Sequence, residues 1–170
     1  MVLLQVLWVL LPVAFTPLAH AAHNVTLGDS DPRIQYSAGW VIYGDPNYLG
    51  GDTHAAYDPN TTAQLDFTGM HCLTSLSPSA FEQRAGTAIY YNGDRNSDHG
   101  YTGISLDGVE TLVNTYAPTL VYQVVVFFRT GLPNTGHRLI IRQAETGRFA
   151  MALDQIVCVW QRFHFPRLQD

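Results

Sequence analysis

Short strand-like runs separated by turn residues fill most of the chain and limit it to an all-β fold. Thr61–Thr68 alternates polar and apolar side chains, and Thr87–Tyr91 is rich in β-branched and aromatic residues. Asp107-Gly108 predicts a hairpin, because glycine tolerates the positive φ that such turns require. Helical periodicity is nearly absent. We therefore predict one antiparallel β-sandwich of about eight strands.

The same alternation predicts which side chains form the core. Thr119–Phe128, the longest later apolar run, is typical of a strand that is buried on both faces. The predicted core consists of Ile34, Trp40, Leu65, Phe67, Ile89, Ile104, Leu106, Val124, Val126, Leu139, Ile141 and Leu153. At 170 residues the chain is long enough to bury a single core.

The N-terminus predicts export. An apolar run, Val2–Leu18, precedes small residues at Ala19 and Ala21, so we place a signal peptide at residues 1–21. No Lys or Arg precedes the run, which leaves an uncleaved signal-anchor as the alternative. No later apolar run is long enough to cross a membrane. We expect a secreted, extracellular protein whose mature chain has no membrane span.

Export favours two covalent modifications. Asn24 and Asn60 each begin an N-x-T sequon and are predicted glycosylation sites. Cys72 and Cys158 are the chain's two cysteines, so a disulfide between them is the expected pairing in an oxidising compartment. The alternative for Cys158 is packing as a small apolar side chain in its strand.

The charge of the chain argues against nucleic-acid binding. Lys and Arg number 9 against 14 Asp and Glu, the formal net charge is −5, and the cations are not clustered. Neutralising a phosphate backbone requires several clustered cations. We therefore expect no nucleic-acid partner.

Calcium is the one cofactor for which the sequence offers ligands. Asp94, Asn96 and Asp98 stand at alternate positions, as oxygen ligands of calcium would, but Ser105 occupies the place of the glutamate that closes a calcium-binding loop. The alternative is a solvated turn whose side chains cap their own backbone. The histidines lack metal-ligand spacing, so no other metal is expected.

Catalytic motifs are missing from the sequence. Neither HExxH nor GxSxG occurs. Asp52, Asp94, Asp98 and Asp107 could supply the carboxylate pair of a glycosidase, but no spacing selects two of them. We expect a protein that is not an enzyme.

Four segments resemble a family of secreted and membrane-anchored fungal proteins, mainly from basidiomycetes. "DSDPRIQYSAGW" is similar to the family's opening, D-x-D-P-x-I-x-Y-x-x-x-W, and "LDFTG…TAIYYNG…HGYTGISLDG" is similar to its F-T-G-T and S-L-D-G segments. "FFRTGLPNTGHRLIIRQ" is similar to its T-G-L-x-x-G-x-H-x-L-x-I segment, and "ALDQIVCV" to its closing strand. The resemblance covers about Leu27–Val159. It implies a galactose-binding-like jelly roll at residues 24–159, an architecture shared by many carbohydrate-binding modules.

Two segments depart from this family pattern. In the family, F-T-G runs directly into the strand that begins here at Thr87, so residues 70–86 form an irregular insertion. Codons for Gly69-Met70 and Ala85-Gly86 can hold splice signals, and we interpret the insertion as a retained intron. The alternative is a genuine long surface loop. Residues 160–170 also depart from the family and form an irregular tail.

The resemblance implies a non-catalytic module that binds a glycan or wall polysaccharide at the fungal cell surface. The first alternative is a structural or interaction ectodomain of a receptor-like membrane protein whose transmembrane segment is missing from this chain. A hydrolase is the third hypothesis.

Two segments rich in Gly, Asp, Asn and Tyr, Gly44–Tyr57 and Asn92–Tyr101, are the candidate binding loops. Sugar rings stack on aromatic faces, while Asp, Asn and His bind hydroxyl groups. Trp40 and Tyr43 lie nearby, although a core position is favoured for Trp40. The expected ligand-binding residues, converging at one end of the sandwich, are Tyr48, Asp52, Asp98, His99 and Tyr101. The alternative is a pair of unrelated solvated loops.

Overall fold

Among the residues that the structure describes, the secondary-structure elements are β-strands, apart from one 3-10 turn, η1 (Leu49–Gly51). The structure is a computed structural model that describes residues 22–59, 61–68, 84–146 and 149–162. Its strands are β1 (Ala22–Gly28), β2 (Gln35–Tyr36), β3 (Trp40–Gly44), β4 (Asp52–Ala56), β5 (Thr62–Thr68), β6 (Arg84–Arg95), β7 (Tyr101–Leu106), β8 (Val109–Asn114), β9 (Val121–Leu132), β10 (Gly136–Gln143), β11 (Met151–Leu153) and β12 (Gln155–Arg162). Neighbouring strands pair antiparallel. The predicted all-β, antiparallel fold class is confirmed.

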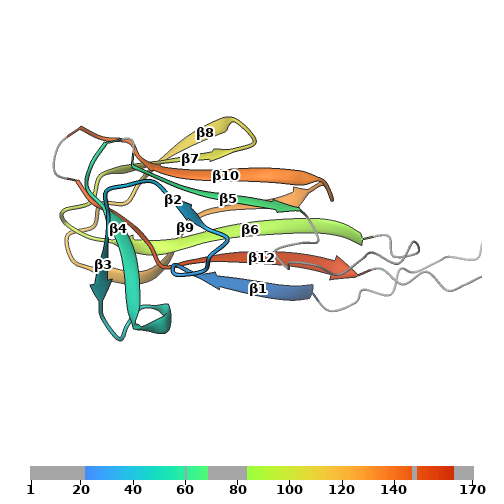
Figure 1. Cartoon of the computed structure of the whole chain (residues 1–170), viewed down its shortest axis with the longest axis horizontal. Coiled ribbons are helices and arrows are strands. Elements are labelled where there is room, and N and C mark those ends of the chain that lie inside the picture. Colours follow the sequence, from blue (N-terminus) through green and yellow to red (C-terminus); the bar gives the residue numbers. More distant parts are fainter. Residues whose placement is uncertain (1–21, 60, 69–83, 147–148, 163–170) are drawn as a thin grey trace, which may run out of the picture.

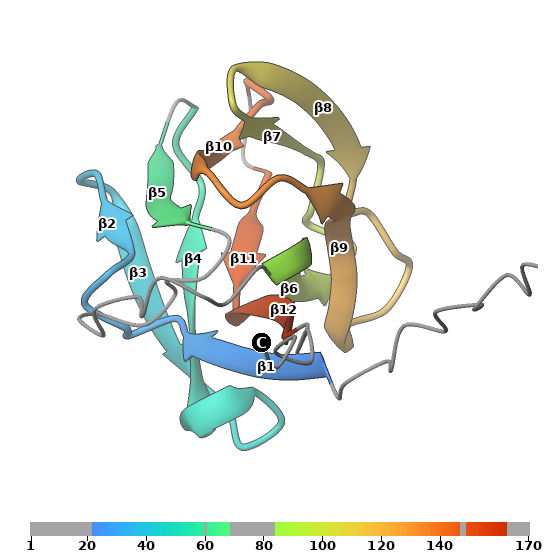
Figure 2. The ribbon, with the colours of Figure 1, turned by 90° about the vertical axis from the view of Figure 1, so that its right-hand side faces the viewer.

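Two larger sheets face each other and a smaller one lies at one end. One sheet has the strand order β1-β12-β6-β9 and the other β2-β5-β10-β7-β8 (Figure 1). The small sheet, β11-β4-β3, crosses the left-hand end of the sandwich in Figure 1. Figure 2 shows the same ribbon turned by 90° about the vertical axis. The site described below lies at the end that β3 and β4 cross.

Strand alternation places the core between the two larger sheets. Leu65 and Phe67 point inward from β5, and Leu139 and Ile141 point to the same side of the sheet from the neighbouring β10. Burying one such side chain contributes about 1.5–3 kcal/mol. Ten of the predicted core residues are buried: Ile34, Leu65, Phe67, Ile89, Ile104, Leu106, Val126, Leu139, Ile141 and Leu153. Trp40 is half-buried against this core, and its Nε1 donates to the carbonyl of Thr62 at 3.0 Å.

Two expectations about the apolar run around β9 are wrong. Val124 is only half-buried and is not part of the core, and the run is not covered on both faces, since Val125 and Phe128 are exposed. The reason is that β9 is an edge strand whose pairing with β6 shifts register three times, and Gln123 has a positive φ of 52°. A bulge of this kind breaks the alternation, so the consecutive Val126 and Phe127 are both buried.

The predicted hairpin at Asp107-Gly108 is confirmed. Leu106 of β7 pairs with Val109 of β8, so two residues form the turn. Both adopt positive φ, 53° at Asp107 and 84° at Gly108, as a primed turn requires.

The last residues of the predicted insertion pair with the first residues of the predicted tail in one β-ladder. β6 begins at Arg84, inside the predicted 70–86 insertion, and its first residues pair with the end of β12, where Arg84 lies opposite Arg162. β12 thus continues into the predicted 160–170 tail, and Trp160 is buried. Residues 69–83 and 163–170 lie outside the described residues, and so do the signal peptide, Asn60 and Cys72. The intron, the disulfide and glycosylation of Asn60 stay predictions.

Within the described ranges, no helix is long and apolar enough to span a membrane.

Candidate functional site

A cavity of about 280 Å³ opens at the end of the sandwich that β3 and β4 cross. One wall is formed by the chain from β3 to just beyond β4, and the other by the end of β6 and the turn that leads into β7. The chain around the start of β9 and β11 complete the lining. The two segments that the sequence marked as candidate loops therefore meet at one cavity.

Four tyrosines line this cavity in two edge-to-face pairs. The rings of Tyr43 and Tyr57 are 6.4 Å apart between centroids, and the Tyr57 hydroxyl donates to the Tyr43 hydroxyl at 3.3 Å. The rings of Tyr48 and Tyr122 are 5.0 Å apart. Tyr43 is 48% exposed, whereas Tyr48 is buried, so the first pair presents ring surface to solvent and the second closes the inner wall.

A buried carboxylate with an unused acceptor lies deep in the cavity. Asp94, near the end of β6, is 4% exposed, and its Oδ2 accepts a short hydrogen bond from the Tyr48 hydroxyl. Its Oδ1 is buried without a hydrogen-bond partner. Burial raises the pKa of Asp94, against the opposing effects of Tyr48 and of the nearby His99. Burial likewise raises the pKa of Tyr48.

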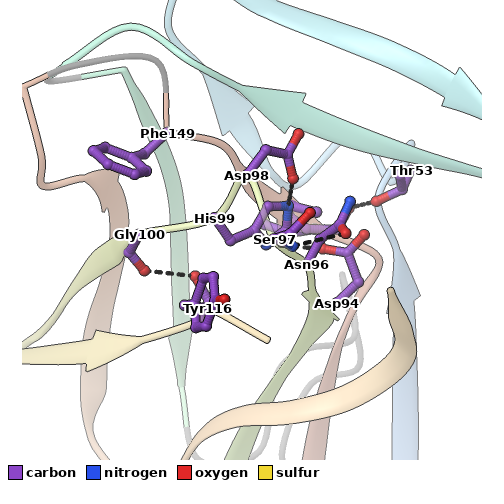
Figure 3. Close-up of polar contacts among 12 residues, drawn as sticks. Thr53, Asp94, Asn96, Ser97, Asp98, His99, Gly100, Tyr116 and Phe149 are labelled. Atoms are coloured by element: carbon purple, nitrogen blue, oxygen red, sulfur yellow. Dashed lines mark hydrogen bonds and ion pairs between the residues drawn. The ribbon is translucent and has the colours of Figure 1, made fainter. Parts of the chain in front are cut away.

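His99 brings a second unsatisfied buried atom to the same place. Its ring is 4% exposed, and its Nδ1 lies 3.4 Å from Asp94 Oδ1 without forming a hydrogen bond. Its Nε2 lies 3.8 Å from Asp98 Oδ1, and Asp98 is exposed (Figure 3). The turn is held locally, because the His99 backbone N–H donates to the carbonyl of Asn96 at 3.2 Å. Two residues that line the cavity therefore keep unused hydrogen-bonding capacity.

A third aspartate at the cavity is already engaged by the protein. Asp45 Oδ2 accepts from the Tyr122 hydroxyl and its Oδ1 from the backbone N–H of Asn47, both at 2.9 Å. The Asn47 N–H and the Tyr122 hydroxyl hold the pKa of Asp45 below its ordinary value. Asp45 therefore orients Tyr122 and adds negative charge to the rim.

Three of the five sequence-predicted binding residues line the cavity, and two do not. Tyr48, Asp98 and His99 line it. Asp52 does not, because alternate residues of β4 point to opposite faces, and Thr53 and Ala55 of the same strand face the cavity instead. Tyr101 is 43% exposed in β7 but lies outside the lining. Ligand binding by the three lining residues stays a prediction.

Some cavity residues were not among the predicted ligand-binding residues. Tyr122 comes from the start of β9, far along the chain, and no sequence spacing connects it to Tyr48. Asp94 was considered only as a calcium or catalytic residue. The signal that could have selected Asp94 is its place beside Asn92 and Gly93 at the end of a strand.

Calcium ligation by Asp94, Asn96 and Asp98 stays a prediction. Asn96 Oδ1 accepts from the backbone N–H of Ser97 at 2.8 Å, as a capped turn would. Across the part of the chain that the structure describes, no three His, Cys, Asp or Glu residues are grouped so that they could hold a metal ion.

A second cavity, of about 550 Å³, opens at the opposite end of the sandwich, near the start of β10. Its charged groups are paired with one another. Arg138 donates to both carboxylate oxygens of Asp66, at 2.7 and 3.0 Å, and His137 Nδ1 lies 2.7 Å from Asp107 Oδ2. These pairs leave little capacity for a ligand. Asp107 also lies too far from Asp94 to form the carboxylate pair of a glycosidase, because the two line cavities at opposite ends.

The remaining predicted residues lie away from both cavities. Asn24 is exposed on β1 and is accessible for glycosylation. Cys158 is buried on β12, and its predicted partner Cys72 is outside the described residues.

Comparison with known proteins identifies the class of fold. No protein-family model matches the chain, and no curated protein matches it in sequence. A two-domain esterase active on acetylated mannans is similar over 90% of this chain and 40% of its own, with a TM-score of 0.56 and 15% identity. A Paenibacillus sp. cycloisomaltooligosaccharide glucanotransferase is similar over 78% of this chain and 18% of its own, with a TM-score of 0.52 and 11% identity.

A family 35 carbohydrate-binding module from Clostridium thermocellum is similar over 79% of this chain and 97% of its own, with a TM-score of 0.49 and 14% identity. This chain spans less than half of the esterase and of the glucanotransferase. The chain thus has a β-sandwich fold that also occurs as one part of larger proteins.

Proposed function

We propose that this protein is a non-catalytic, extracellular carbohydrate-binding module and that the tyrosine-lined cavity is its binding site. The observation that carries the proposal is the meeting of exposed tyrosine rings with a buried, partly unsatisfied carboxylate in one cavity. A sugar ring presents an apolar C–H face that stacks on an aromatic ring, and hydroxyl groups at its edge that donate to carboxylates. Tyr43 and Tyr57 supply the first contact, and Asp94 and Asp98 the second.

The structural relatives support this proposal at the level of the fold. Both the esterase and the glucanotransferase are named for action on carbohydrates, and this chain spans only a part of each. The predicted signal peptide and the exposed sequon at Asn24 support action outside the cell. The resemblance to fungal proteins supports a glycan or wall polysaccharide at the fungal cell surface as the partner.

A glycan array with two matched tyrosine variants tests the proposal. Tyr43→Ala removes an exposed ring at the cavity, and Tyr101→Ala removes a similarly exposed ring outside it. We expect saturable binding of at least one glycan, weakened about tenfold by Tyr43→Ala because its stacking face is lost, and unchanged by Tyr101→Ala. Equal loss in both variants would contradict this site, and absence of saturable binding would contradict the function.

An interaction ectodomain is a second candidate, and one exposed surface favours it. Phe128, 60% exposed, stacks on Tyr90 at 5.9 Å on the outer face of the β1-β12-β6-β9 sheet, with Val125 exposed beside it. Exposed apolar patches often mark protein interfaces. This candidate gains support if no glycan binds and Phe128→Ser abolishes capture of a protein partner.

A hydrolase is a third candidate, because a carboxyl group with a raised pKa can act as a general acid. Asp94 has that property and shares its cavity with a second carboxylate, Asp98. Release of reducing sugar that Asp94→Asn abolishes would be required to support catalysis.

A further inference from the structure

We propose that the tyrosine-lined cavity selects a sugar that carries a protonated amino group, that is, a hexosamine unit without an acetyl group. This inference rests on the proposed function and names the class of ligand for the same site.

The lining of the cavity is anionic. Asp45, Asp94 and Asp98 line it, and no Arg or Lys is among the described lining residues. His99 is the single lining residue there that can become cationic. A ligand carboxylate would meet three aspartates, whereas an ammonium group would be attracted by all of them.

The described arginines do not line the cavity to compensate for this charge. The chain has 9 arginines and no lysine. Arg33, Arg138 and Arg142 form ion pairs with carboxylates elsewhere. Arg95 directly follows Asp94 in β6 but is not among the lining residues of the cavity.

A further aspartate lies close to the carboxyl groups of the cavity. Asp154 is fully buried next to β11, and its Oδ1 accepts from the backbone N–H of Leu49 at 2.8 Å. Burial raises the pKa of Asp154, and the charges of Asp29, Asp94 and Asp52 raise it further. Several carboxyl groups therefore share this end of the molecule, and the basic side chains described beside them are the histidines His54, next to Asp29, and His99, next to Asp94 and Asp98.

Asp94 provides the contact point for an ammonium group. Its Oδ1 is an acceptor without a partner in a residue that is 4% exposed, and an uncompensated buried acceptor is costly. An ammonium group carries three donors and no acceptor, so it can satisfy Asp94 Oδ1 and still reach the exposed Asp98. A hydroxyl group can donate only one hydrogen bond and brings no charge. Binding of the cation would also favour the ionised form of Asp94.

The tyrosines explain why the cation should belong to a sugar ring. Tyr43 and Tyr57 present aromatic faces beside the carboxylates, and such faces attract both C–H groups and cations. A small ammonium ion would use the carboxylates but leave the rings without contact. An amino sugar uses both.

Calorimetric titration with two matched oligomers tests the inference. The probes are the hexamer of β-1,4-linked glucosamine and the fully N-acetylated hexamer, which has the same length and linkage but no charge. We expect the amine hexamer to bind at least about tenfold more tightly than the acetylated one. Asp94→Asn and Asp98→Asn should each remove most of this preference. Cooperative thermal unfolding of both variants checks that they fold.

Asp66→Asn is the matched control, because it removes one charge at the opposite end of the sandwich and should keep the preference. If Asp66→Asn reduces the preference as much as the cavity variants do, the attraction is to net charge and the inference is overturned. If the two hexamers bind equally, or if only other neutral glycans bind and Tyr43→Ala weakens them, the amine inference fails and the proposed function stands. If no glycan binds at all, the proposed function itself fails.

Discussion

Two histidines at opposite ends of the sandwich differ in the hydrogen-bond partners of their ring nitrogens. His99 has a ring nitrogen without a hydrogen bond, whereas both ring nitrogens of His137 face acceptors. His137 Nδ1 lies 2.7 Å from Asp107 Oδ2, and its Nε2 lies 2.8 Å from the carbonyl of Pro133. An imidazole donates from both nitrogens only when it is protonated. The two contacts therefore favour the protonated form of His137, whereas His99 keeps a ring nitrogen without a hydrogen-bond partner.

The pairing of His137 predicts a pH-dependent stability. Burial lowers its pKa, but the hydrogen bonds to Pro133 and Asp107 outweigh burial and raise the pKa above its ordinary value. Its contribution should be fully present below the unfolded-state pKa of about 6.5 and lost as the pH rises through the folded-state value.

Urea unfolding of the wild type and His137→Gln across a pH series measures this contribution, since other groups titrate in both proteins and cancel in the difference. We expect the difference in unfolding free energy between the two proteins to shrink as the pH rises. A constant difference would contradict the account.

Single residues of the site were predictable only in part. Tyr48, Asp98 and His99 stood out because they lie in segments too polar for a core. Asp52 was misplaced because strand alternation turns it away from the cavity, and Tyr122 was missed because only the folded β9 brings it next to Tyr48. Composition selects segments, but it does not give the direction of a side chain.

At the scale of elements, regular strands and primed turns were predictable and bulged strands were not. In β5 and β10 the apolar residues alternate without interruption, so their inward faces could be read directly. The pairing of β9 with β6 contains register shifts, and the hydrophobicity of the sequence does not reveal where these shifts occur. Asp107-Gly108 was recognisable because its turn type depends on local backbone chemistry.

The β7–β8 hairpin gives a prediction for its glycine. Gly108 has a φ of 84°, and a Cβ built there meets no atom within 4 Å, so Gly108→Ala adds backbone strain without a clash. We expect Gly108→Ala to lower the unfolding free energy by about 1 kcal/mol. Urea denaturation measures the change.

Gly136→Ala is the control for this prediction. A Cβ at Gly136 also meets nothing within 4 Å, and its φ is not positive, so the change should stay within about 0.5 kcal/mol of zero. Equal effects of the two substitutions would show that the turn does not require a positive φ at Gly108.

At the scale of the whole molecule, the sandwich separates a stabilising end from an open end. Near the start of β10, carboxylates are paired with Arg138 and His137 at short distances, whereas at the end that β3 and β4 cross, His99 lies farther from Asp94 and Asp98 and no described Arg lines the cavity. The ladder between the start of β6 and the end of β12 also joins the two segments that depart from the fungal family pattern. The ion pairs near the start of β10 can stabilise the fold, while the cavity at the end that β3 and β4 cross keeps polar groups without hydrogen-bond partners.

The most direct test of this account is a backbone-amide NMR titration of the protein with the glucosamine hexamer. The account predicts saturable shifts concentrated at Tyr43, Asp94, Asp98 and His99, with little change at Arg138 near the second cavity. Shifts centred on Phe128 at the outer face of the sheet, or no saturable shifts with any glycan that the array identifies, would contradict a binding site in the tyrosine-lined cavity.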